Sequence, residues 1–215
     1  MTLALFGLEH RLSNDPLYSL QDADYIASSK RGTIRRWLDQ YSDLAQSNQE
    51  MLSYHAALQM VAVAALRRDG VSMRHIRNML RFLRTEMENP YPFLTQRFYV
   101  GGKQVFLENL ETMMEISSTQ GQLAWASVIL PFLHELDFNE ELAVGWWPLG
   151  RKNFVLVNPD YGYGLPVIAG TFVRTEILKD RFLSVGDMHE VAKEFDLPFE
   201  AVQQAILFED KRLAA

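Results

Sequence analysis

A short predicted helix carries the side chains in this sequence that are best suited to binding chemistry. Its cations and the hydroxyl among them are Lys30, Arg31, Thr33, Arg35 and Arg36. A helix that only packs into a core needs no such row of charge. Guanidinium and ammonium groups, however, pair with phosphates and with the acceptor edges of bases. Contact with nucleic acid is therefore the first chemical hypothesis for this chain.

The residues around these cations predict two short helices joined by a tight turn. Apolar side chains in residues 20–27 are spaced for one helix face, and a second apolar stripe lies in residues 33–38. Ser28 and Ser29 are expected to supply the turn and a cap for the second helix. This arrangement is a helix-turn-helix, whose second helix can enter the major groove of DNA.

The spacing of these residues resembles the first half of a MerR-type DNA-binding domain. The matching positions are Tyr18, Ser19, Ala23, Ile26, Ser29, Thr33, Ile34, Arg35, Arg36 and Trp37. A second stretch resembles the second helix pair of that family, at Leu52, Ser53, Arg67, Arg68, Asp69, Gly70, Val71, Ser72, Ile76 and Arg77. The wing is shortened to about Ser42–Glu50, and the family's long C-terminal coiled coil is missing. The resemblance implies that DNA is contacted by Ser29, Lys30, Arg31, Thr33, Arg35 and Arg36.

Two longer helices follow in the predicted front domain. We expect one from Tyr54 to Arg68 and an amphipathic one that starts after a cap at Ser72. Arginines recur along one stripe of the second helix, at Arg74, Arg77, Arg81 and Arg84. A solvated face and a phosphate-contacting face explain that row equally well.

The predicted fold class is mainly α with small β-hairpins. One hairpin is expected in residues 97–108, around Gly101-Gly102. An apolar helix that Pro131 bends or stops comes next, and a second hairpin is expected to pair residues 143–148 with residues 153–159. A change of composition near Gly121 divides the chain. Residues 1–120 form a MerR-like DNA-binding domain, and residues 121–215 form a second, small helix-turn-helix-like domain.

The C-terminal domain resembles the small helical domain of many bacterial antitoxins that pair with PIN-type toxins. The matching positions are Gly164, Pro166, Val167, Ile168, Gly170, Thr171, Val173, Gly186, Asp187, Val191, Phe195, Leu197, Val202, Ala205, Ile206 and Phe208. With the MerR-like front, this order resembles one group of VapB-type antitoxins and implies a PIN-type ribonuclease toxin as the partner. Either a cation or simple steric cover would block the acidic nuclease site, and the candidate cations are Arg174, Lys179 and Arg181. Alternatively, the acidic rear would face the basic rim that binds RNA.

The two ends of the chain differ in charge, although the total is −6. Residues 30–103 hold twelve cations and six acids, a net +6, so the remainder carries −12. Residues 187–195, which Asp187 is expected to cap, and residues 198–209 predict a second helix-turn-helix. Its last helix has no Lys or Arg and would present Glu200 and Glu209, so phosphate would repel it. Core packing is the favoured explanation for Val202, Ala205 and Ile206 of that helix, and an exposed protein-binding face is the alternative. A basic front and an acidic rear indicate two partners of opposite character.

The sequence lacks the residues and motifs that other kinds of binding or catalysis would require. The chain has no Cys, its five His show no metal-ligand spacing, and no serine-nucleophile or dinucleotide-binding motif occurs. We expect no metal, no cofactor and no enzymatic activity. The polar cluster from His134 to Glu141 is more typical of a solvated acidic turn than of a catalytic site. No apolar run reaches membrane-spanning length and there is no secretory leader, so we expect a cytoplasmic protein without membrane contact.

These patterns together predict an antitoxin of a type II toxin–antitoxin system that also binds its operator DNA as an autorepressor. A homodimer is expected, because one short recognition helix offers few base contacts and symmetric half-sites match a twofold dimer. Two alternatives remain open. One is a MerR-like ligand-responsive transcriptional regulator whose rear domain is a sensor. The other is a structural interaction protein whose cations are merely solvated.

Overall fold

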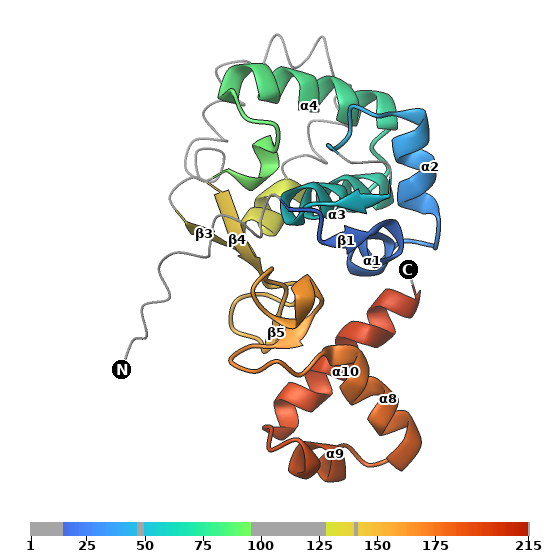
Figure 1. Cartoon of the computed structure of the whole chain (residues 1–215), viewed down its shortest axis with the longest axis vertical. Coiled ribbons are helices and arrows are strands. Elements are labelled where there is room, and N and C mark those ends of the chain that lie inside the picture. The colour runs from blue at the N-terminus through green and yellow to red at the C-terminus, as the bar shows by residue number, and fades with distance from the viewer. Residues whose placement is uncertain (1–14, 47–49, 96–127, 140–141, 215) are drawn as a thin grey trace.

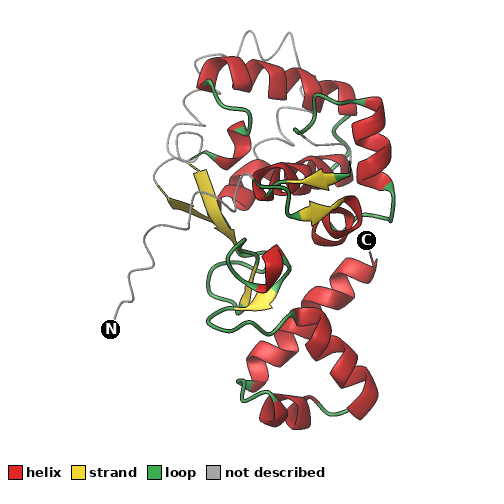
Figure 2. Ribbon diagram, in the orientation of Figure 1, coloured by secondary structure: helices red, strands yellow, loops and turns green. Residues whose placement is uncertain are grey.

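The computed structural model describes residues 15–46, 50–95, 128–139 and 142–214. In these parts the chain is mainly α-helical with short antiparallel strand pairs, which confirms the predicted fold class (Figure 2). The hairpin predicted for residues 97–108 lies outside the described residues. No helix in the described parts is both long enough and apolar enough to cross a membrane.

The front of the chain is built around one buried helix. Its elements are β1 (Tyr18–Ser19), α1 (Leu20–Ile26), α2 (Thr33–Gln40), β2 (Met51–Leu52), α3 (Tyr54–Arg68), α4 (Met73–Met87) and the 3-10 turn η1 (Pro92–Leu94). Helix α3 has the bounds predicted from the sequence, and it is apolar and buried almost all round. Figure 1 shows α1, α2 and α4 arranged about it.

Local capping signals set where the front helices begin. The Ser19 hydroxyl accepts a hydrogen bond from the N–H of Asp22, and the Asp22 carboxylate accepts one from the N–H of Ser19, both at 3.1 Å. Helix α1 therefore starts with a capping box. Ser53 caps α3 and Ser72 caps α4, each by accepting from a backbone N–H. The cap predicted at Ser72 is confirmed.

The strand pairs of the middle part differ from the prediction. The strands are β3 (Leu136–Asn139), β4 (Leu142–Trp146), β5 (Val155–Leu156) and β6 (Val167–Ile168). Strand β4 pairs with β3, and β5 pairs with β6, so the predicted hairpin between 143–148 and 153–159 is wrong. One bridge of it exists, in which Trp146 and Val157 exchange backbone hydrogen bonds of 2.9 and 2.8 Å. Burial of Leu136 opposite Trp146 draws the acidic segment into a strand.

The helix before β3 covers residues 128–134 of the described chain and passes through Pro131. The sequence predicted that this proline bends or stops the helix, and of these two outcomes the stop is wrong. Ile129, Phe132 and Leu133 are buried in the front core, and this burial holds the segment helical beyond the proline.

The rear of the chain is a second small helical unit. It consists of the 3-10 turn η2 (Gly162–Gly164) and the helices α8 (Thr175–Val185), α9 (Met188–Glu194) and α10 (Phe199–Ala214). Asp187 caps α9 by accepting from the N–H of His189 at 2.8 Å, as the sequence predicted. Val202, Ala205 and Ile206 are buried, which agrees with their interpretation as core residues.

Buried apolar side chains form two clusters. The first ends in sequence at Val157 and the second begins at Ile168. Figure 1 shows the rear helices stacked on one end of the front unit. The domain boundary between residues 120 and 121 stays a prediction, because residues 96–127 lie outside the described chain. A cut at residue 120 would separate the front helices from later residues that belong to the front cluster, which are Ile129, Phe132, Leu133, Leu136, Ala143, Trp146 and Val157.

Candidate functional site

One buried carboxylate fixes the geometry of the front helix-turn-helix. Asp24 of α1 is only 3% exposed and accepts hydrogen bonds from the N–H of Gly32 at 2.6 Å and of Ile34 at 2.8 Å. These N–H groups lie at the start of α2, where a helix has unpaired donors and a partial positive charge. Burial raises the pKa of Asp24, and the two N–H donors act in the opposite direction. Helix α1 thus sets the position of α2 through a direct bond.

Asp24 takes the role that the sequence analysis gave to Ser28 and Ser29. Gly32 is the residue before α2, has a left-handed φ of 81° and offers no side-chain cap. Ser28, with φ of 50°, and Ser29 form the turn as predicted, but the cap predicted there is wrong. The sequence could have predicted this role of Asp24. Asp24 lies on the apolar face of α1, one turn after Leu20, and a single acid on such a face needs a buried partner.

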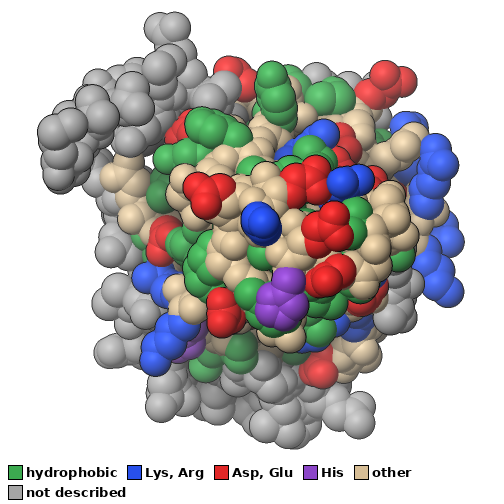
Figure 3. All heavy atoms as spheres, turned by 90° about the horizontal axis from the view of Figure 1, so that it is seen from below, with side chains coloured by type: hydrophobic (Ala, Val, Ile, Leu, Met, Phe, Trp, Pro, Cys, Tyr) green, Lys and Arg blue, Asp and Glu red, His purple; other side chains and the backbone are tan. Residues whose placement is uncertain are grey.

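The predicted DNA-binding cations lie on the outer side of this motif. Lys30 and Arg31 just before α2 and Arg35 and Arg36 on it are all exposed, and we call these four residues the α2 cations. They form no ion pair with any residue that the structure describes. The opposite side of α2 buries Ile34 and Leu38. Figure 3 shows Lys and Arg side chains gathered along the edge on which Figure 1 places α2. The α2 cations are therefore free to approach phosphates.

The two other predicted residues of this site are less exposed. Ser29 is half-buried, and its hydroxyl donates to the carbonyl of Ala27 at 3.4 Å. Thr33 is half-buried at the first position of α2, and its N–H donates to the carbonyl of Lys30 at 3.0 Å. Both residues shape the turn beside the α2 cations.

The arginine row of α4 is mostly engaged inside the protein. Arg77 and Arg81 form ion pairs with the two carboxylate oxygens of Asp43 at 2.8 and 2.7 Å. Arg84 donates to the carbonyls of Asp43 and Leu44 at 2.5 and 3.1 Å. These three arginines, the arginine clamp, hold the segment after α2 against α4. Burial raises the pKa of Asp43, but the bonds from Arg77 and Arg81 outweigh it and lower the pKa overall.

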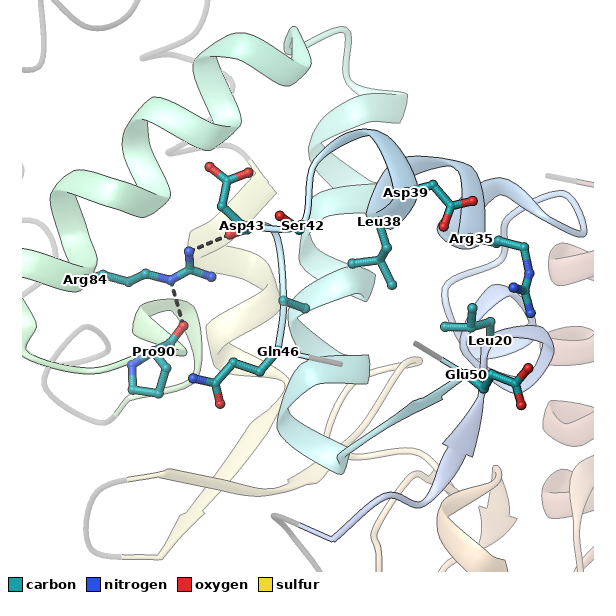
Figure 4. A pocket seen from close by; sticks show the side chains of 11 residues that line it. Leu20, Arg35, Leu38, Asp39, Ser42, Asp43, Gln46, Glu50, Arg84 and Pro90 are labelled. Carbon is teal, nitrogen blue, oxygen red and sulfur yellow. Dashed lines mark hydrogen bonds between the residues drawn. The ribbon is translucent and has the colours of Figure 1, made fainter. Parts of the chain in front are cut away.

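A surface groove of about 770 Å³ lies between α2, the segment after it and α4 (Figure 4). Arg35 and Asp39 of α2 line it on one side, and Arg84 lines it on the other. Figure 4 shows that Arg84 already bonds the carbonyls of Asp43 and Pro90. The strongest polar groups on that side are thus satisfied within the chain.

The rear unit contacts the helix-turn-helix directly. Glu209 of α10 is 2% exposed and accepts hydrogen bonds from Tyr25 of α1 at 2.5 Å and from Thr175 of α8 at 2.6 Å. Tyr18 donates to the carbonyl of Gly164 at 2.6 Å. The sequence analysis placed Glu209 on an exposed face. Glu209 is buried because it contacts Tyr25, which lies 184 residues earlier in the chain, and no local sequence pattern shows such a contact.

The rear cations predicted to block a nuclease are each paired with an acid. Arg174 pairs with Glu176 at 3.0 Å. The other two pairs, both at 2.7 Å, are Lys179 with Asp210 and Arg181 with Glu194. Their role in toxin binding stays a prediction, and any such contact would first have to displace these carboxylates. Figure 3, which views the molecule from the rear unit, shows acidic side chains spread over this face.

The polar cluster around His134 has a structural function. The indole N–H groups of Trp146 and Trp147 donate to Glu135 at 3.0 Å and to Asp137 at 2.5 Å. Burial raises the pKa of Glu135, and the bond from Trp146 opposes that rise. Within the described residues, no group of three His, Cys, Asp or Glu side chains could hold a metal ion.

Comparison with known proteins gives a sequence relative and a solved structure of similar fold. No protein-family model matches the chain. It is similar to a protein of Mycobacterium tuberculosis strain H37Rv named "Putative antitoxin VapB45", with 25% identity over 89% of this chain and 92% of the relative. Its fold is similar to the X-ray crystal structure of Rv2018 from Mycobacterium tuberculosis. That match has a TM-score of 0.72 and 22% identity and covers 90% of this chain and 98% of the other. The named relative supports the resemblance to VapB-type antitoxins.

Proposed function

We propose that this protein is an antitoxin of a type II toxin–antitoxin system. It neutralises a PIN-type ribonuclease toxin and binds operator DNA as an autorepressor. The observation that carries the proposal is the similarity to a protein named as an antitoxin over 89% of this chain and 92% of that one. A match over 89% of the chain must include part of both the basic helix-turn-helix and the acidic rear unit. Both proposed partners place the action of the protein in the cytoplasm.

The α2 cations support the DNA-binding half of the proposal. Arg35 and Arg36 project from a helix that Asp24 and the front core hold in place, so little order has to be gained on binding. An eight-residue helix such as α2 reaches few bases. Two copies in a homodimer would read symmetric half-sites of an operator with adequate affinity.

The charge of the rear unit supports the toxin-binding half. Residues 160–215 hold ten acids and six cations. A ribonuclease must bind RNA phosphates with a basic surface, and an acidic protein unit complements such a surface. An antitoxin acts by covering the nuclease site, so the proposal needs no catalytic group in this chain. In this division, the front binds DNA and the rear binds the toxin.

The groove beside α2 gives little support to a ligand-responsive regulator. Its groups Asp43 and Arg84 already bond other residues of the chain. A small ligand that used Asp43 or Arg84 would first have to break these bonds, and Arg35 on the other side of the groove is one of the cations assigned to DNA.

The experiment that tests the proposal uses the full chain and the product of the adjacent open reading frame. We expect the two proteins to copurify after co-expression, and we expect ribonuclease activity to be inhibited in the complex. The free chain should shift the DNA upstream of its own gene in a gel, with affinity that falls as salt rises. A chain that binds neither the neighbouring product nor its upstream DNA contradicts the proposal.

A further inference from the structure

A strained turn on the rear unit presents one tyrosine almost fully to solvent. Tyr163 is 84% exposed and has φ of 58°, the left-handed region that non-glycine residues seldom adopt. Gly162 and Gly164 on either side also have positive φ, 56° and 76°. Glycine adopts positive φ without strain, so the strained residue of this turn is Tyr163. Strain of this kind persists only where surrounding structure holds it, and it often marks a functional site.

The surrounding structure does hold this turn. The Tyr18 hydroxyl donates to the carbonyl of Gly164 at 2.6 Å in a buried position. A Cβ atom at Gly164 would collide with that tyrosine, and one at Gly162 would collide with Val167. Glycine is therefore required at both positions, and Tyr163 is fixed outward by contacts beneath it.

Two more aromatic side chains lie beside this turn. Tyr161 is 37% exposed and Phe172 is 73% exposed, and their ring centres are 5.5 Å apart. Ile177, 40% exposed, follows on α8. We call Tyr161, Tyr163 and Phe172 the aromatic surface. Grouped apolar side chains on a soluble protein mark binding sites, whereas isolated ones need no explanation.

The charges around the aromatic surface disfavour nucleic acid as its ligand. Proteins that stack bases on aromatic rings also supply a positive groove for the backbone. Here Asp160 adjoins Tyr161 in sequence, and Arg174, which lies beside Gly162, is paired with Glu176 at 3.0 Å. A phosphate backbone would meet carboxylates at this site.

The same charges disfavour a second copy of this chain. A twofold contact through the aromatic surface would bring two rear units together, each with ten acids and six cations in residues 160–215. Like charges across an interface oppose association. A protein with a basic rim around an apolar contact is complementary to this surface.

We propose that Tyr161, Tyr163 and Phe172 anchor the contact with the ribonuclease toxin. This inference rests on the proposed function and names the surface that the toxin covers. Rigid aromatic side chains contribute a large share of binding energy at protein interfaces, and charged rims contribute mainly to association rate and specificity. The aromatic surface supplies the affinity, and the acids of the rear unit steer the basic toxin toward it.

The test measures binding of the full chain to the purified product of the adjacent open reading frame. The variants are Tyr163→Asn, Phe172→Ser and their double substitution. Asn tolerates left-handed backbone, so the turn keeps its shape. Leu183→Ser is the matched control, because Leu183 is 68% exposed on α8 and lies outside the aromatic surface. Each single substitution should weaken binding at least tenfold and the double one at least a hundredfold. The control should change binding less than threefold.

Each other outcome overturns the inference in a distinguishable way. If the double variant binds within threefold of the parent chain, the aromatic surface is not the anchor and the proposed function stands. If the parent chain does not bind the nuclease, the proposed function fails and the inference fails with it. If the double variant keeps nuclease binding but loses self-association in light scattering, the surface is a contact between copies of this chain. A variant that loses affinity for its upstream DNA shows a general defect and also contradicts the assignment.

Discussion

The chain contains two helix-turn-helix arrangements with opposite surfaces. In the front, the second helix α2 exposes Arg35 and Arg36 and receives its N-terminal cap from Asp24. In the rear, α10 has no Lys or Arg between Phe199 and Asp210, and it turns Val202 and Ile206 into the core. Similar local architecture therefore does not imply a similar ligand. The placement of charge distinguishes the two units.

The two units also differ in whether their cations are paired with acids. Arg35 and Arg36 have no ion-pair partner among the described residues, whereas Lys179 and Arg181 pair with Asp210 and Glu194. A paired cation must lose its partner before it can bind a new anion, and the net gain is then small. The front unit is thus prepared for an anionic ligand, and the rear unit is not.

The largest effect is expected from removing the free cations of α2. The Arg35→Ala/Arg36→Ala double variant should lose about 1–3 kcal/mol of DNA-binding free energy for each arginine that reads a base. An arginine that contacts phosphate should instead reduce the salt slope by about one. Fluorescence anisotropy with the upstream DNA at several salt concentrations separates these cases. Lys193→Ala, on α9 of the rear unit, is the control and should leave DNA affinity unchanged. Unchanged affinity in the double variant would remove α2 as the reading helix.

The second effect concerns the bond that positions α2. Asp24→Ala leaves the N–H groups of Gly32 and Ile34 without their acceptor, and it should lower the free energy of unfolding by about 2–3 kcal/mol. Asp24→Asn keeps one acceptor oxygen, so its free energy of unfolding should lie between those of the parent chain and Asp24→Ala. Urea unfolding measures both, with Asp39→Ala on the exposed side of α2 as the control. An Asp24→Ala variant as stable as the control would show that α2 needs no cap from α1.

A pH dependence is expected from the arginine clamp. The pKa of Asp43 is lowered in the folded state, so its pairing stabilises the fold above the ordinary carboxyl pKa of about 4. That stabilisation is lost as pH falls through the lowered folded pKa. Asp43→Asn should therefore reduce stability at pH 7 and have less effect near pH 2, as thermal unfolding at the two values would show. An equal effect at both pH values would mean that the ionised carboxylate contributes nothing.

The smallest effect is expected in the paired cations of the rear unit. Arg181→Ala breaks an exposed pair with Glu194 and should cost less than about 1 kcal/mol of stability. Its affinity for the neighbouring nuclease should change less than threefold, because the aromatic surface supplies the anchor. Calorimetric titration gives the affinity, and urea unfolding gives the change in stability. A tenfold loss of affinity for the nuclease would show that Arg181 contacts the toxin.

The sequence predicts those parts of the fold that local chemistry determines. The bounds of α3 and the caps at Ser72 and Asp187 follow from side chains within a few residues, and the structure has them as expected. The exposed position of Arg35 and Arg36 also follows, because the apolar stripe of α2 fixes which side is buried.

The errors concern partners that are distant in the chain. Strand β4 pairs with β3 and not with residues 153–159, because burial of Leu136 against Trp146 decides the pairing. The arginine row of α4 fits solvent or phosphate in the sequence alone, and only the folded chain brings Asp43 to it. Contacts of this kind depend on how helices meet, which periodicity along one helix does not record.

The most direct test of the division between the two units is simultaneous binding. The full chain is saturated with labelled upstream DNA, and one equivalent of the neighbouring nuclease is added. The resulting complexes are then separated by electrophoresis or sized by light scattering. Because the α2 cations and the aromatic surface lie on different units, we predict a larger complex that contains DNA, this chain and the nuclease. Release of free DNA in proportion to the added nuclease would contradict the account, since both partners would then compete for one surface.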